Sequence, residues 1–173
     1  MISNITGHIR FANESDIPEI RQIYDVHTSN ITSLVSFEEE TPSVEELTLR
    51  WKSIKDDNLP FFVFEIDKSV AGYAYATKFR SRPAYLHTVE DSVYVADAYQ
   101  NRGIGKALLF TIINKCQESG VRCIVAVLGT EQDNPASVTL HRKAGFQEVG
   151  TLHDVGNKNG KWIDRLLMEY IIM

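Results

Sequence analysis

The residues Ser92-Val93-Tyr94-Val95, followed by Gln100-Asn101-Arg102-Gly103-Ile104-Gly105-Lys106-Ala107-Leu108, decide the fold of this chain. Alternating apolar side chains predict a strand, and the glycines predict a turn that opens a helix. The first turn of a helix has backbone N–H groups without intrahelical partners, and the helix dipole makes that end positive. The segment therefore predicts a site for an anion such as phosphate.

Two common phosphate-binding loops do not fit this segment. In a Walker loop, Gln100 would have to be glycine, and Ala107 stands where the hydroxyl that binds Mg²⁺ belongs. The dinucleotide fingerprint needs a third small residue, and Leu108 occupies that position. A turn without any ligand remains the simple alternative, because glycine pairs are common in turns.

Length and composition bound the remaining possibilities. The chain has 173 residues, 43% of them apolar and 24% charged, which predicts one soluble domain over residues 1–173. The net charge of −5 argues against nucleic-acid or membrane-surface binding. The first residues show no signal peptide and no stretch is apolar enough to span a membrane, so we expect a cytoplasmic protein. Cys116 and Cys123 fit no zinc spacing, and we predict no metal site.

The order of predicted elements indicates an α/β fold. Apolar patterns and turn signals predict strands at 9–12, 61–66, 70–78, 88–95, 123–128, 146–154 and 161–172, and helices at 17–27, 44–54, 103–119 and 135–144. We expect one mixed, mostly antiparallel central sheet of six to seven strands, flanked by about four helices on both faces.

Two motifs together resemble the GNAT family of N-acetyltransferases. Gln-x-x-Gly-x-Gly at 100–105 is similar to that family's acyl-CoA pyrophosphate loop, and Asn134-Pro135-Ala136-Ser137 with Leu140-His141-Arg142-Lys143-Ala144-Gly145-Phe146 is similar to its second motif. The resemblance implies a single-domain GNAT fold, acetyl-CoA as acetyl donor, and a homodimer. It also implies the cofactor-binding residues Val93, Tyr94, Val95, Gln100, Asn101, Arg102, Gly103, Ile104, Gly105, Lys106, Asn134 and Ser137. The side chains of Arg102 and Lys106 fit a solvated surface equally well.

Four further segments resemble the phosphinothricin and methionine sulfoximine branch of that family. They are Ala71–Ala76, Arg82–Tyr85, Thr88–Val95 and Gly160–Asp164. The branch implies a small amino-acid-like amine as substrate, such as phosphinothricin, methionine sulfoximine or methionine sulfone. Leu86-His87 departs from the branch pattern, which often has an aromatic residue here, so the preferred substrate side chain stays open.

Acetyl transfer to an amine needs a group that accepts the amine's proton. Glu90 lies in a predicted apolar strand beside the loop, where partial burial would raise its pKa, and we predict it as the general base. A solvated strand carboxylate is the alternative. Strand alternation places Asp91 on the opposite face from Glu90, so we do not expect both carboxylates in one site.

His141 shares a helix face with Asn134. In the resembled family this position often carries a tyrosine that protonates the departing thiolate. We predict that His141 is catalytic, as an acid, a proton relay or an orienting group, and a structural histidine is the alternative. Because no cysteine is placed to carry the acetyl group, we expect direct attack in a ternary complex.

Substrate-binding residues are expected in two loops. Arg82 and Tyr85 match the branch, and Arg82 would grip an anionic group, whereas Lys78 and Arg80 fit a solvated loop equally well. Phe37 and Glu38 would complete the pocket. We expect Trp162 in the core rather than in the pocket, although the resembled branch places a Gly-x-Trp turn near the partner subunit's site. Two other functions stay open: a GNAT enzyme acting on another amine, such as a protein N-terminus or a polyamine, and a non-catalytic acyl-CoA-binding module.

Overall fold

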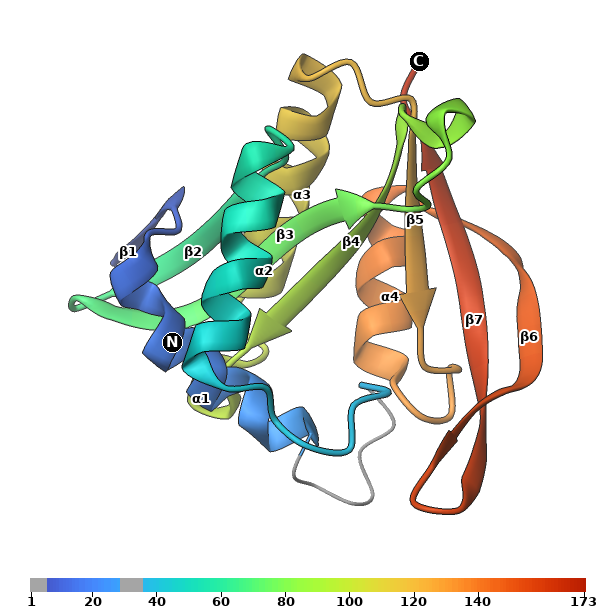
Figure 1. The fold of residues 1–173 in the computed structure, drawn as a ribbon, viewed down its shortest axis with the longest axis horizontal. Coiled ribbons are helices and arrows are strands. Elements are labelled where there is room, and N and C mark those ends of the chain that lie inside the picture. The colour runs from blue at the N-terminus through green and yellow to red at the C-terminus, as the bar shows by residue number, and fades with distance from the viewer. Residues whose placement is uncertain (1–5, 29–35) are drawn as a thin grey trace.

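The computed structural model describes residues 6–28 and 36–173 and contains one seven-stranded sheet in the order β1-β2-β3-β4-β5-β7-β6 (Figure 1). Neighbouring strands are antiparallel except for the parallel pair β4–β5. The elements are β1 (Gly7–Phe11), α1 (Ile17–Thr28), α2 (Val44–Asp56), β2 (Phe61–Ile66), β3 (Ser69–Lys78), β4 (Thr88–Val95), α3 (Ile104–Glu118), β5 (Cys123–Leu128), α4 (Pro135–Ala144), β6 (Gln147–Lys158) and β7 (Lys161–Ile171).

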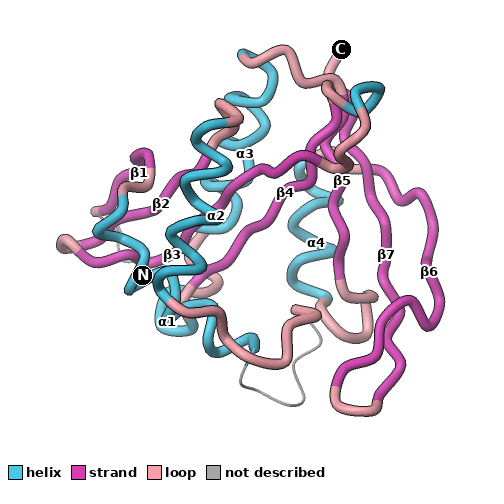
Figure 2. Tube along the Cα trace, viewed as in Figure 1, coloured by secondary structure: helices cyan, strands magenta, loops and turns pink. Residues whose placement is uncertain are grey.

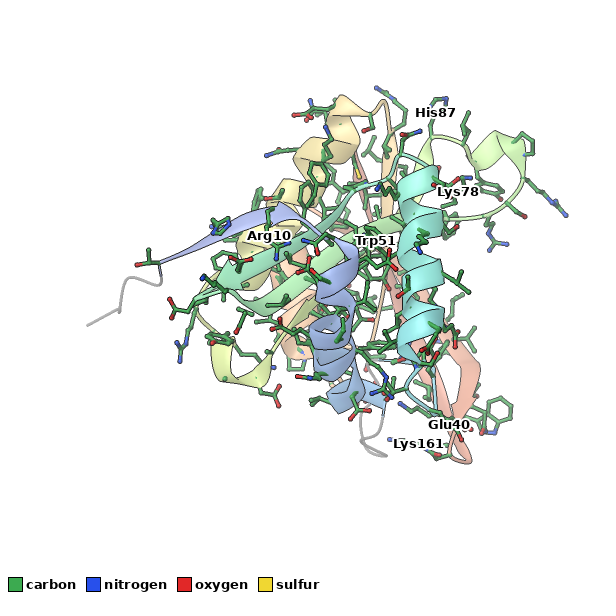
Figure 3. The ribbon with its side chains drawn as sticks, turned by 60° about the vertical axis from the view of Figure 1, so that its left-hand side comes forward. Arg10, Glu40, Trp51, Lys78, His87 and Lys161 are labelled. Carbon is green, nitrogen blue, oxygen red and sulfur yellow. The ribbon has the colours of Figure 1, made fainter. Side chains whose placement is uncertain are left out.

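The helices cover both faces of the sheet (Figures 1 and 2). On one face α1 and α2 bury an apolar cluster that includes Ile17, Ile20 and Trp51, and Figure 3 labels Trp51 on this side. On the other face α3 and α4 pack over a second cluster around Leu108 and Ile112. Two apolar layers therefore hold the sheet between them, as the amphipathic patterns predict. Within the described residues, no helix is long and apolar enough to cross a membrane.

The predicted fold class is confirmed, and β2, β4, β5 and α4 have the predicted bounds. The prediction for the sixth strand was too short, because it ended at Asp154. In the structure Asp154 has a φ of 50° at an irregularity in the register, and β6 continues to Lys158. Positive φ marks a bulge here rather than the end of the strand.

The parallel pair β4–β5 opens along its length. The two strands pair only from Thr88↔Cys123 to Glu90↔Val125, and both continue for several residues beyond the last pair. Figure 1 shows them diverging. The opening exposes the backbone of β4 from Asp91 onward, which is where the predicted site residues begin.

Candidate active site

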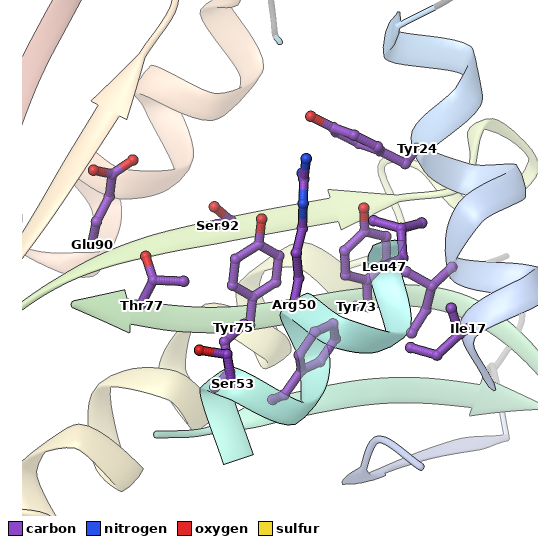
Figure 4. Close-up of a pocket in the computed structure, with 13 residues that line it drawn as sticks. Ile17, Tyr24, Leu47, Arg50, Ser53, Tyr73, Tyr75, Thr77, Glu90 and Ser92 are labelled. Atoms are coloured by element: carbon purple, nitrogen blue, oxygen red, sulfur yellow. The ribbon is translucent and has the colours of Figure 1, made fainter. Parts of the chain in front are cut away.

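Two cavities lie on the two sides of β4. The first, which we call the Glu90 pocket, has a volume of about 350 Å³ and lies under α1 and α2 (Figure 4). It is largely aromatic and apolar, with Glu90 and Arg50 as its charged residues. Its described lining residues are Ile17, Ile20, Tyr24, Leu47, Arg50, Ser53, Ile54, Phe61, Tyr73, Tyr75, Thr77, Glu90 and Ser92.

The second cavity, which we call the β4–β5 cleft, has a volume of about 760 Å³ and runs between β4, the start of α3, and α4. Most of the predicted cofactor-binding residues line it: Val93, Tyr94, Val95, Gln100, Asn101, Gly103, Ile104, Gly105, Lys106, Asn134 and Ser137. His141 lines it as well. Ser92 lines both cavities, so they meet at β4.

The glycine turn forms the start of α3 at one end of the cleft. Gly103 is the N-terminal cap residue with a φ of +84°, a conformation that side chains with a Cβ rarely adopt. No side chain caps this helix, so the N–H groups of its first turn stay open to the cleft. The geometry fits an anion such as pyrophosphate. Arg102 lines neither cavity; its guanidinium lies 5.6 Å from the centroid of the Tyr99 ring.

The start of α4 forms the opposite wall of the cleft. Asn134 caps this helix, because its side chain accepts the N–H of Ser137 at 3.2 Å. The Asn134 oxygen is therefore occupied, while its amide N–H groups remain available as donors to a ligand.

His141 and Asp91 form a buried pair behind this wall. Their Nε2 and Oδ2 atoms are 3.0 Å apart, and the two side chains are only 2% and 1% exposed. The other ring nitrogen, Nδ1, donates to the Ser137 carbonyl at 2.8 Å. Burial alone would lower the pKa of His141, but the hydrogen bond to Asp91 and its negative charge outweigh burial and raise that pKa. Asp91 thus lies on the face opposite Glu90, as strand alternation predicts.

Glu90 is half-buried at the edge of the Glu90 pocket. Burial raises the pKa of its carboxyl, and the negative charge of Asp91 raises it further. A carboxylate with a raised pKa is a better proton acceptor for an amine than a solvated one. Glu90 thus lies on β4 as predicted, but in the Glu90 pocket and not among the residues that line the cleft with the glycine turn.

The predicted substrate-binding residues lie outside the described lining of both cavities. Arg82 is exposed, and Tyr85 packs edge-on against Phe79 at 5.8 Å. Figure 3 labels Lys78 and His87, which flank this turn in the chain. Glu38 reaches the Glu90 pocket indirectly, because it accepts a hydrogen bond from Arg50 at 2.6 Å.

Phe37 lies against the hairpin of β6 and β7. The Arg165 guanidinium is 3.9 Å from the centroid of the Phe37 ring, and a Cβ on Gly156 would come within 2.7 Å of that ring. The buried Lys158 donates to the carbonyl oxygens of His27 and Ser36 at 3.3 and 3.1 Å. The hairpin therefore holds the segment that carries Phe37 and Glu38.

Sequence reasoning missed three groups at this site. Arg50, the tyrosines of the Glu90 pocket and Asp91 were not proposed, although Tyr73 and Tyr75 lie on one face of a predicted strand. The signal for the tyrosines was their two-residue spacing in a predicted strand. Within the described residues, no group of three or more His, Cys, Asp or Glu side chains is arranged to hold a metal ion.

Comparison with known proteins identifies relatives. The Acetyltransferase (GNAT) domain family matches residues 9–167. A phosphinothricin N-acetyltransferase from Alcaligenes faecalis is 41% identical over 93% of this chain and 80% of its own length. An L-methionine sulfoximine/L-methionine sulfone acetyltransferase from Salmonella typhimurium is 33% identical over 93% of this chain and 92% of its own length. The crystal structure of a GNAT superfamily phosphinothricin acetyltransferase from Sinorhizobium meliloti, in complex with AcCoA, matches with a TM-score of 0.90 and 36% identity over 96% of this chain and 89% of that one.

A sheet that opens between two parallel strands, with an uncapped helix start at the opening, gives a cleft that fits a phosphate-bearing ligand. With these similarities the chain belongs to the GNAT acetyltransferase family. It is an N-acetyltransferase that takes its acetyl group from acetyl-CoA, as the two motifs predict.

Proposed function

We propose that this enzyme acetylates the primary amine of a small amino-acid-like substrate of the phosphinothricin, methionine sulfoximine or methionine sulfone type, by direct attack in a ternary complex. One observation carries the proposal: the Glu90 pocket and the β4–β5 cleft meet at Ser92. An amine and a thioester can therefore approach β4 from opposite sides. The names of the relatives support the substrate class.

On the cleft side, residues of this chain bind and orient acetyl-CoA. The open N–H groups at the start of α3 and the loop from Gln100 to Lys106 hold the pyrophosphate, and the Asn134 amide faces the pantetheine arm. Backbone N–H groups of Val93 to Val95 polarise the thioester carbonyl, an effect of about 3 kcal/mol per donor in other acyl transfers.

On the pocket side, Glu90 accepts the proton of the amine. His141 acts as an orienting group, because both ring nitrogens already have partners and the side chain is 2% exposed. With Asp91 it fixes α4, and hence Asn134 and Ser137, against β4. Glu38 acts on the pocket through its hydrogen bond with Arg50, and Phe37 packs against the β6–β7 hairpin beside it. The turn with Arg82 and Tyr85 would meet the substrate only outside the pocket lining.

The test is a thiol-detection assay of CoA release over free amino acids and their sulfone, sulfoximine and phosphinate analogues. Glu90→Gln should lower kcat by about 10²- to 10⁴-fold and leave acetyl-CoA binding unchanged. Glu118→Gln, an exposed carboxylate on α3, is the matched control and should keep wild-type rates. Unchanged acetylation by Glu90→Gln would refute the base assignment, and CoA binding without any acetylation by the wild type would indicate a binding module.

We also propose that residues 1–173 act as one catalytic domain in a cytoplasmic homodimer that binds no nucleic acid. The expectation that Trp162 lies in the core is wrong: this residue is 62% exposed near the tip of the β6–β7 hairpin, and Val155 and Leu152 of the same hairpin are also exposed. Such an apolar surface fits a contact with a second copy. Light scattering should give twice the monomer mass, and Trp162→Ser should shift the protein toward the monomer.

A further inference from the structure

Arg50 is a charged residue in the largely aromatic and apolar Glu90 pocket. It projects from α2 toward the pocket, and Figure 4 shows Tyr75 and Ser92 between it and Glu90. Among the described residues that line the pocket, Arg50 is the only cation and Glu90 the only carboxylate. The pocket therefore presents one charge of each sign.

Two carboxylates hold the Arg50 guanidinium in place. Nη1 donates to Glu38 Oε1 at 2.6 Å, and Nη2 donates to Glu46 Oε1 at 2.5 Å. A guanidinium has five N–H donors, so three remain without a partner among the described residues. The side chain is 45% exposed, which leaves these donors open to a ligand.

Both charges act on the same point of the pocket. Burial raises the pKa of Tyr75, a hydrogen bond with Ser92 and then the charge of Arg50 oppose that shift, and the charges of Glu90 and Glu38 add to it. The hydroxyl of Tyr75 therefore lies within electrostatic reach of both groups. A zwitterionic amino acid bound over the Tyr75 ring would have its amine on the side of the Glu90 carboxylate and its carboxylate on the side of the Arg50 guanidinium N–H groups.

We propose that Arg50 is the specificity-determining residue that binds the carboxylate of an α-amino acid while the amine faces Glu90. This inference rests on the proposed function and makes it more specific. Amines without a neighbouring carboxylate, such as polyamines and protein N-termini, leave the Arg50 donors unfilled. Arg50, rather than Arg82, thus separates free amino acids from other amines, because Arg82 is not among the residues that line the pocket.

The experiment compares two substrates that differ only in the carboxylate: methionine sulfone and its methyl ester. The variant is Arg50→Gln. A second variant, Arg50→Lys, keeps the positive charge but cannot bind a carboxylate through two parallel N–H donors. Lys52→Gln is the matched control, because Lys52 is an exposed cation on the same helix that pairs with Glu14. Values of kcat/KM for both substrates are measured with each protein at saturating acetyl-CoA, and thermal unfolding verifies that each variant folds.

We expect Arg50→Gln to lose about 10- to 100-fold in kcat/KM for the acid and less than threefold for the ester, as for a lost charge-assisted hydrogen bond. Arg50→Lys should fall between, and Lys52→Gln should match the wild type. Equal losses for acid and ester would show a structural role and overturn the inference. The inference would also be overturned if Arg82→Gln lost kcat/KM for the acid alone and Arg50→Gln did not. If the wild type acetylates neither substrate nor any other amine, the proposed function fails; if it acetylates both equally well, only this inference fails.

Discussion

Replacing Asp91 with asparagine should make the pH dependence of stability change in a defined way. In the native protein Nδ1 of His141 must donate to the Ser137 carbonyl, because a carbonyl cannot donate. In a neutral imidazole the other nitrogen, Nε2, would then be an acceptor facing the Asp91 carboxylate. The pair therefore needs one additional proton, and this requirement agrees with the raised pKa of His141.

That proton sets the sign and size of the effect. Because the folded pKa of His141 is above the unfolded value of about 6.5, the pair stabilises the fold fully below pH 6.5. The stabilisation falls as pH rises through the folded pKa, by at most about 1.4 kcal/mol per pH unit. The side-chain amide introduced by Asp91→Asn would donate to a neutral His141, so the variant needs no extra proton.

At pH 6 we expect Asp91→Asn to be less stable than the wild type by about 1.5 to 3 kcal/mol, the range for a hydrogen bond to a charged group, because a neutral hydrogen bond replaces the ion pair. The difference should shrink between pH 6.5 and 9. Urea unfolding followed by the fluorescence of the buried Trp51 measures it. The exposed pair Lys115–Glu118 supplies the control, because Glu118→Gln should change stability by less than about 1 kcal/mol at every pH. A stability difference that stays constant from pH 6 to 9 would refute the shared proton.

Three further outcomes follow from single positions. The rate of acetylation, as kcat/KM against pH, should fall as pH drops through the raised pKa of Glu90, and Glu90→Gln should lack this limb while keeping the one set by the amine. Gly103→Ala should strain the left-handed turn by about 1 to 2 kcal/mol. It should weaken acetyl-CoA binding measured by calorimetry and leave KM for the amine unchanged. An unaltered affinity for acetyl-CoA would contradict the anion site. Gly156→Ala should press on the Phe37 ring, cost about 1 to 3 kcal/mol, and lower Tm by several degrees, whereas an unchanged Tm would mean that the contact is loose.

Much of the fold was accessible from the sequence because local patterns specify it. β4 alternates and β5 is an unbroken apolar run, so both strands have the bounds that their patterns predict. The glycine turn was equally clear, since Gly103 needs a conformation that other residues avoid. These features depend on a few neighbouring residues, which a sequence displays directly.

The charged groups of the site were harder to predict from the sequence, because their partners are distant in sequence. Asp91 and His141 are 50 positions apart, and alternation gives only the face of Asp91, not the register of α4 against it. Arg50 meets Glu38 through the path of the segment that precedes α2, and no periodicity predicts that path. Trp162 failed for a related reason, since an apolar residue near a hairpin tip is buried only if something covers it.

The alternation of side chains along β4 determines which group serves which side of the site. Glu90 and Asp91 are adjacent, yet alternation places one in the Glu90 pocket and the other behind the β4–β5 cleft. The negative charge of Asp91 still raises the pKa of Glu90. The pair with His141 therefore affects both sides of the strand: it fixes the wall that faces acetyl-CoA and favours the proton-accepting chemistry on the other side. A change at Asp91 that neutralises its charge should thus lower the pKa of Glu90 and also loosen α4. The same residue therefore affects both the stability of the fold and the fall of kcat/KM at low pH.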